Sequence, residues 1–260
     1  MNSLTALPLW VLAIFVVIAT FIAMAGPVII RRCIELERLR TNNEVAGFTF
    51  AAIGVLYAVL LGFAVIVVWE EFNHAVTTVM EEAGTADAIY QLSQGIGGNG
   101  GVTLRGELSE YLRAVINEEW PAMEQGQSSP AVTRALDDMY ATSLSFRPAE
   151  FHDAGILAAT FRQLAVLTHE RRTRLGIAEG TVPDAVWLVL FGGAALTVSF
   201  TFFFGSRSVF AQSLMTGMLA MLILSTLFVV VVIDYPFTGS VKVTPAPLQK
   251  VLVDLSKPAQ

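Results

Sequence analysis

The second apolar segment of the sequence carries small residues in a regular pattern. Five of them recur at steps of four, three, four and four residues: Gly47, Ala51, Gly54, Ala58 and Gly62. This spacing places all five on one face of a helix, and small side chains let helices approach closely in lipid. The pattern therefore predicts either a helix-packing interface or the wall of a pore, where small side chains leave room for an ion.

Charged residues gather at the ends of the apolar segments. They are Arg31, Arg32 and Glu44 at one end, and Glu70, Asp184 and Asp234 at the other. Fixed charges beside a narrow path of low dielectric change the local concentration of ions. These six residues are therefore candidates for the two mouths of a pore. The simpler interpretation of Glu44 is that it pairs with Arg38 or Arg40 beside a helix N-terminus.

Three arginines lie close in sequence to the second group of acids: Arg171, Arg172 and Arg174. Acids and arginines that meet at one membrane surface commonly form exposed salt bridges. We therefore expect a solvated collar of salt bridges around these positions. The alternative is a vestibule that concentrates ions.

Glu70, His74 and Glu81 follow the second apolar segment at helical spacing. Two carboxylates and an imidazole suit a divalent metal, but nothing fixes a third coordinating element, so we expect a solvated helix face and no metal site. No nucleophile-elbow or phosphate-loop motif is present. We predict no catalytic residues, no cofactor and no enzymatic activity. Cys33 is the only cysteine, which excludes an internal disulfide.

The elements that must position these residues are strongly apolar. Hydrophobic residues make up 54% of the 260-residue chain, charged residues make up 15% rather than the usual ~25%, and mean hydropathy is +0.62. Four stretches carry no charge: 6–30, 45–69, 185–206 and 208–233. Each exceeds the roughly 20 residues that a helix needs to cross a bilayer, so we predict four spans in contact with lipid. A net charge of −6 without a basic tract excludes nucleic acid as a partner.

Residues 70–184 form an acidic insert between the second and third spans, with 17 Asp and Glu against 8 Arg and no Lys. Apolar residues continue at helical spacing after the second span, which predicts that this span extends into the insert as one long helix. The glycine-rich segment 95–101 is expected to end that helix, because so many glycines neither hold a helix nor pack. Further helices are predicted at 102–120, ended by Pro121, at 130–145, and from Pro148 to about 177.

The sequence thus predicts an all-α fold in three parts. Residues 1–69 hold two spans, residues 70–184 form a helical extramembrane domain, and residues 185–260 hold two spans and a short tail. Arginines near the membrane favour the cytoplasmic side, especially in short loops. The densest cluster runs from Arg31 to Arg40 in the first short loop, which favours an external insert and external termini.

Four motifs resemble the bacterial bestrophin-like membrane family of unknown function. They read N-N-E-V-A-G-F at 42–48, I-G-V-L-Y-A-V-L-L-G-F at 53–63, V-V-W-E-E-F at 67–72 and D-Y-P-F-T-G at 234–239. The resemblance covers nearly the whole chain. That family is in turn similar to the bestrophins, which are pentameric anion channels with cytoplasmic termini and a pore lined by the second span. The resemblance therefore implies an orientation opposite to that favoured by the arginines. No acidic calcium clasp matches theirs residue by residue.

Together these observations lead to a functional expectation. We expect a symmetric homo-oligomer, a pentamer by the resemblance, in the bacterial inner membrane, with the second span as the wall of an ion channel, for anions by the same resemblance. The alternative is a non-conducting membrane sensor or scaffold whose helical insert binds a ligand or a partner protein. An amphipathic insert without a catalytic motif suits both.

Overall fold

The computed structural model describes residues 8–41, 43–147 and 151–256, which fall into two compact units. The membrane unit comprises the chain up to Glu70 and Thr181–Asp234. The extramembrane unit comprises Glu71–Gly180 and the chain from Tyr235 onward. These ranges contain helices and no strand, and four helices are long and apolar enough to cross a membrane, which confirms the predicted all-α membrane fold.

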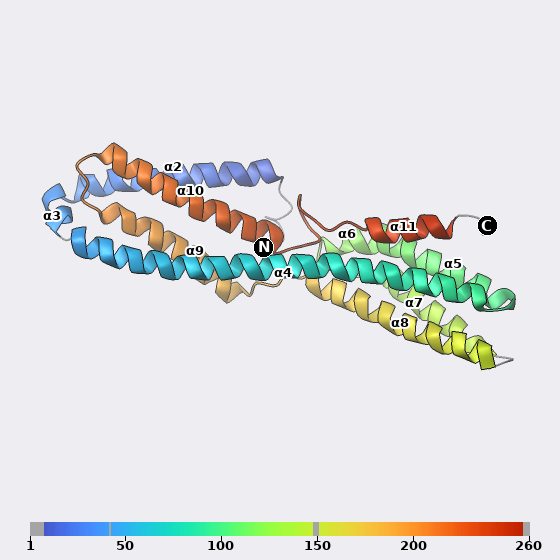
Figure 1. Cartoon of the computed structure of the whole chain (residues 1–260). Coiled ribbons are helices and arrows are strands. Elements are labelled where there is room, and N and C mark those ends of the chain that lie inside the picture. The colour runs from blue at the N-terminus through green and yellow to red at the C-terminus, as the bar shows by residue number, and fades with distance from the viewer. Residues whose placement is uncertain (1–7, 42, 148–150, 257–260) are drawn as a thin grey trace. The chain divides into compact units, whose positions relative to one another are not determined.

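The membrane unit contains the four apolar helices. Its elements are α2 (Leu9–Cys33), α3 (Leu36–Thr41), the first part of α4 (Asn43–Gly95), α9 (Asp184–Phe200), the 3-10 turn η2 (Thr201–Phe203) and α10 (Val209–Ile233). Helix α2 packs beside α10 (Figure 1). The core between α4, α9 and α10 contains Tyr57, Leu190 and Leu227, and the Tyr57 hydroxyl donates a hydrogen bond to the Leu190 carbonyl at 3.0 Å.

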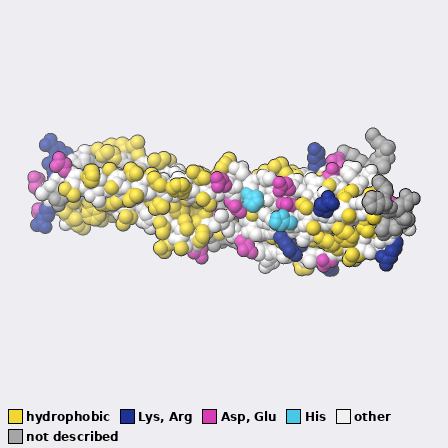
Figure 2. Space-filling view, turned by 60° about the horizontal axis from the view of Figure 1, so that its bottom comes forward, with side chains coloured by type: hydrophobic (Ala, Val, Ile, Leu, Met, Phe, Trp, Pro, Cys, Tyr) yellow, Lys and Arg dark blue, Asp and Glu magenta, His cyan; other side chains and the backbone are white. Residues whose placement is uncertain are grey.

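The surface of the membrane unit is apolar, as lipid contact requires. Figure 2 shows hydrophobic side chains over most of its visible face and charged side chains gathered at one end. Large apolar side chains such as Phe48, Leu188 and Phe210 are exposed on three different helices.

The extramembrane unit is a helical bundle around one large core. Its elements are the remainder of α4, α5 (Gly98–Ala114), the π turn η1 (Val115–Glu119), α6 (Trp120–Met123), α7 (Pro130–Ser145), α8 (Phe151–Ile177) and α11 (Ala246–Leu255). Helix α4 is therefore a single helix of 53 residues, about 80 Å long, which confirms the predicted continuation of the second span. The predicted helix at 130–145 is also confirmed, and the Ser129 hydroxyl caps it by accepting from the Ala131 N–H at 3.1 Å.

The glycine-rich segment differs from the prediction. Helix α4 ends at Gly95, but α5 begins at Gly98, inside the run of glycines. The expectation that these glycines do not pack is wrong, because a Cβ at Gly100 would overlap the Phe146 ring and one at Gly101 would overlap the Ser93 carbonyl oxygen. The absence of side chains lets the segments approach this closely.

Pro121 does not end the second helix of the insert. The helical path continues from α5 through η1 into α6, which reaches Met123. Pro121 occupies the first turn of α6, where its missing N–H and its ring are tolerated, and the π turn widens the helix just before it. Pro148, the predicted start of the last helix, lies outside the described residues, and α8 is observed from Phe151.

The segment after the last span belongs to the extramembrane core. Phe237 is fully buried and its ring meets Trp120 edge-on, with 5.6 Å between ring centroids. Leu248 and Val251 of α11 are buried in the same core, and α11 packs on α5. These residues were predicted only as a short tail, and the structure gives them a share in the folding of the insert.

Candidate functional site

The small residues of α4 lie away from the core of the membrane unit. Tyr57, Leu61, Ala64 and Val68 face that core. The stripe of small residues lies about a quarter of a turn around the helix from these side chains, and none of its members is fully buried: Gly47, Ala51, Gly54, Ala58 and Gly62. At all three glycines of this stripe, an added Cβ would meet nothing within 4 Å. The stripe therefore makes no close helix contact within its own chain.

Close approaches within the membrane unit use other glycines, which the sequence pattern did not single out. A Cβ at Gly193 would lie 2.6 Å from the Tyr57 ring, and one at Gly217 would lie 2.6 Å from Met24. A Cβ at Gly26 would overlap the Phe202 ring. The chain thus has one set of glycines for its own packing and a second set, on α4, that it does not use.

The rest of the outward face of α4 is apolar and exposed. It consists of Phe48, Val55, Val59, Phe63 and Ile66, each more than half exposed. Together with the stripe, these side chains form what we call the outward face of α4. It is the least covered part of a span whose opposite face is packed.

The residues predicted at the first mouth have different environments. Glu44 and Arg32 are exposed, whereas Arg31 is partly buried, and its Nε and Nη2 atoms are covered without a hydrogen-bond partner among the described residues. Next to Glu44, Asn43 exchanges two hydrogen bonds with Gly205: its Nδ2 donates to the carbonyl at 3.1 Å, and the Gly205 N–H donates to its Oδ1 at 2.8 Å. This pair fixes the start of α4 against the loop after η2.

The residues predicted at the second mouth are also not equivalent. Glu70 and Asp184 are exposed. Asp234 is only 2% exposed, and its Oδ1 accepts hydrogen bonds from the N–H groups of Thr181 and Val182 at 3.2 and 3.0 Å. The carboxylate thereby holds the start of the third span to the end of the fourth.

The expected solvated collar around the arginines is wrong for two of them. Arg171 is 7% exposed and Arg174 is fully buried in the extramembrane core. Arg174 lies between Glu82 of α4 and Glu119 of η1, with N–O distances of 2.6 and 2.8 Å, and its guanidinium stacks 5.0 Å from the Trp120 ring centre. Arg171 contacts the other oxygen of Glu119 at 2.6 Å. Only Arg172 is exposed, as expected.

We call Glu82, Glu119, Arg171 and Arg174 the buried ion network. Burial alone would raise the pKa of Glu119, but its hydrogen bonds with Arg171 and the charges of both arginines lower that pKa below the usual range. Tyr111 donates to the Glu82 carboxylate at 2.7 Å, and burial together with that carboxylate raises the pKa of Tyr111. The two arginines therefore favour the ionised form of Glu119.

Sequence reasoning missed this network because it treated acidic residues as solvated. A signal was present: Glu82 lies between Val79, Ala83 and Ala86 on the buried face of α4, where a lone carboxylate needs a cationic partner. Glu70, His74 and Glu81 are all exposed, and no group of three or more potential metal ligands occurs in the described ranges.

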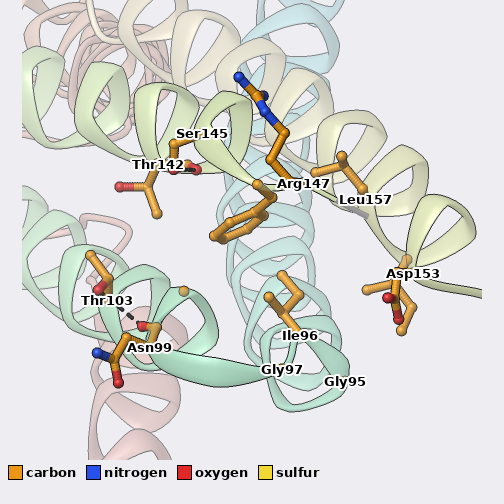
Figure 3. Close-up of a pocket in the computed structure, with 13 residues that line it drawn as sticks. Gly95, Ile96, Gly97, Asn99, Thr103, Thr142, Ser145, Arg147, Asp153 and Leu157 are labelled. Atoms are coloured by element: carbon orange, nitrogen blue, oxygen red, sulfur yellow. Dashed lines mark hydrogen bonds between the residues drawn. The ribbon is translucent and has the colours of Figure 1, made fainter. Parts of the chain in front are cut away.

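The glycine-rich segment borders a cavity of about 550 Å³ in the extramembrane unit. Figure 3 shows Ile96 and Asn99 from this segment on one side, and Thr142, Ser145 and Leu157 across the cavity. The Thr103 hydroxyl donates to the Asn99 carbonyl at 3.0 Å. Arg147 and Asp153 also line the cavity, so its wall combines apolar, polar and oppositely charged side chains.

Comparison with known proteins identifies relatives of this chain. A family model described as Bestrophin-like domain matches residues 9–248. A single-residue variant of a bacterial bestrophin homologue from Klebsiella pneumoniae is 15% identical, with a TM-score of 0.68 over 92% of this chain and 97% of that chain. A second structure of the Klebsiella pneumoniae homologue is 17% identical, with a TM-score of 0.60 over 92% and 96%. No curated protein matches the sequence. Because the family model covers most of its length, the chain belongs to the bestrophin-like family of membrane proteins.

Proposed function

We propose that the protein forms a symmetric oligomer in the bacterial inner membrane and conducts ions, with the span portion of α4 as the wall of the pore. The observation that carries this proposal is the outward face of α4. Its glycines are spaced for close helix contact, yet a Cβ added at any of them would meet nothing within 4 Å in its own chain.

Lipid contact accounts for the bulky apolar side chains of the outward face, such as Phe48 and Phe63, but not for the stripe of small residues beside them. A repeat of Gly and Ala every three or four residues leaves backbone accessible at a helix interface. A second copy of the chain is the simplest partner for such a surface, and a ring of copies would place α4 around a central axis.

Membership of the bestrophin-like family supports the channel class. Bestrophins conduct anions, and Arg31 and Arg32 at the end of α2 supply positive charge that would attract anions to one mouth. Glu44 lies at the first turn of α4, where it would oppose them.

Particle averaging of the detergent-purified protein, combined with ion flux in liposomes, tests the proposal. We expect a ring with α4 around an open axis, together with a reversal potential under a salt gradient. A dimer, or an axis sealed by side chains, with no flux under any gradient would instead establish the non-conducting sensor or scaffold.

The orientation is tested by labelling. Ser128 is exposed in the loop before α7, so Ser128→Cys in a chain with Cys33 replaced is a suitable reporter. The arginine distribution predicts labelling by an impermeant thiol reagent in intact cells. Labelling only after lysis would establish the cytoplasmic insert that the resemblance to bestrophins implies.

A further inference from the structure

A second cavity in the extramembrane unit, of about 640 Å³, lies between the last turns of α4, the outer side of α5 and the end of α11. Its polar lining residues come from three segments: Tyr90 and Gln94 from α4, Arg105, Ser109 and Arg113 from α5, and Ser256 directly after α11. Leu255 of α11 lines the apolar side. Three elements that are distant in sequence therefore build one concave surface.

The spacing along α5 aligns the charged groups. Arg105, Ser109 and Arg113 recur every four residues, so they lie on one face of the helix, with the arginines about 12 Å apart along its axis. Arg105 is partly buried, and its Nη1 donates to the Ser93 carbonyl at 3.5 Å. The helix thus presents two guanidinium groups at the two ends of the cavity, with a hydroxyl between them.

The donors around this cavity are largely unused. Within the part of the chain that the structure describes, neither arginine forms an ion pair, and the side chains of Tyr90, Gln94 and Ser109 make no hydrogen bond. The lining contains no carboxylate, although acids outnumber arginines by 17 to 8 in the insert.

Arg113 has acids on its other side. It also borders a neighbouring cavity that is lined by Glu110 and Glu118, but it pairs with neither of them within 4 Å. The N–H donors of the Arg113 guanidinium are therefore available to another acceptor.

We propose that this cavity binds an elongated organic anion with two phosphate groups joined by a short apolar linker. Each guanidinium offers a fork of N–H donors that matches two phosphate oxygens. A phosphate group carries a third terminal oxygen, which a carboxylate lacks. The side chains of Ser109, Tyr90 and Gln94 supply donors for that oxygen. Leu255 and the Tyr90 ring suit the apolar linker.

Titration calorimetry of the full-length protein in detergent at 150 mM salt tests the proposal, with hexane-1,6-diyl bisphosphate as the probe. We expect one probe bound per chain, weaker binding of hexyl phosphate, and no binding of hexane-1,6-diol. Arg105→Gln and Arg113→Gln should each weaken binding of the probe about tenfold.

Arg162→Gln is the matched control, because Arg162 is exposed on α8 and lies outside this cavity. This variant should bind the probe like the parent. An equal loss for Arg162→Gln would show that the probe only senses net charge and would overturn the proposal, as would the absence of binding to a parent protein that unfolds cooperatively. The measurement needs no ion current, so its outcome does not depend on whether α4 lines a pore.

Discussion

The two units of the chain bury and expose opposite kinds of side chain. In the membrane unit, large apolar residues such as Phe48 and Phe210 face outward, while Gln212 and Thr216 of α10 are buried. In the extramembrane unit, the core is apolar but encloses two Glu and two Arg. The difference teaches that each unit matches the polarity of its surface to its surroundings, and that a network of both charge signs is buried where several helices bring those charges together.

Each unit also holds its helices together by different means. The membrane unit uses close approaches at glycines, such as Gly193 against Tyr57, together with hydrogen bonds such as that from Tyr57 to the Leu190 carbonyl. The extramembrane unit also has close approaches at Gly100 and Gly101, but it adds a large core of bulky side chains and the buried ion network. Substitutions chosen from each unit should therefore fail in different ways, and the following variants test that contrast.

The largest effect is expected in the buried ion network. Arg174→Met leaves Glu82 and Glu119 facing each other in a dry core without their shared cation, so the variant should lose about 3–5 kcal/mol of unfolding free energy. Thermal unfolding and trypsin cleavage of the purified protein would measure this loss. Arg162→Met removes an exposed arginine and should be near neutral. Equal stability of the two variants would contradict a structural role for the network.

The second variant tests the membrane unit. Gly54→Leu adds bulk at a position where an added Cβ meets nothing within 4 Å in its own chain, so we expect the chain to fold while most of the oligomer is lost. Size-exclusion chromatography with light scattering would report the mass of the complex. Gly192→Leu is the control, because Gly192 is also exposed on a span and has no neighbour within 4 Å. If Gly54→Leu assembles like the parent, the stripe faces lipid.

A smaller effect concerns a carboxyl outside the network. Burial raises the pKa of Glu107, and Asp138 and Glu110 raise it further, against a lowering by the hydrogen bond from Thr142. The folded state therefore favours the protonated form, so this group costs stability once pH rises through its folded pKa. Glu107→Gln should raise the melting temperature slightly at pH 7, and the gain should vanish below about pH 4. If Glu107→Gln raised the melting temperature equally at pH 4 and at pH 7, ionisation of Glu107 would not be the cause of the gain.

The smallest effect is expected at the mouth of the proposed pore. Glu44→Gln removes an exposed negative charge next to the outward face of α4 and should raise the anion-to-cation permeability ratio in reconstituted bilayers. The change should be modest, because such a charge is screened within about 8 Å at physiological salt. Glu118→Gln, an exposed substitution in the extramembrane unit, should leave the ratio unchanged. If both variants changed the permeability ratio by the same amount, Glu44 would have no special role at the mouth of the pore.

Sequence patterns predicted the helices well and the use of charges poorly. Hydropathy and helical periodicity identified the spans, the long α4 and the helix from Pro130 to Ser145, because each pattern extends over many residues. The pairing of Glu82 with Arg174 joins positions 92 residues apart, and no local pattern encodes it. The packing of Phe237 on Trp120 also joins distant positions, although Leu248, Val251 and Leu255 recur at helical spacing and indicate an amphipathic helix in the tail.

The place of Phe237 in the extramembrane core has a consequence for synthesis of the protein. The core residue Trp120 emerges from the ribosome long before Phe237, because two membrane spans are translated between Gly180 and Tyr235. At typical elongation rates, synthesis of the 54 residues from Thr181 to Asp234 alone takes about 3 to 11 s. The insert therefore lacks part of its core until the last two spans and Phe237 have been synthesised. Completion of the extramembrane core thus depends on synthesis of the last two spans.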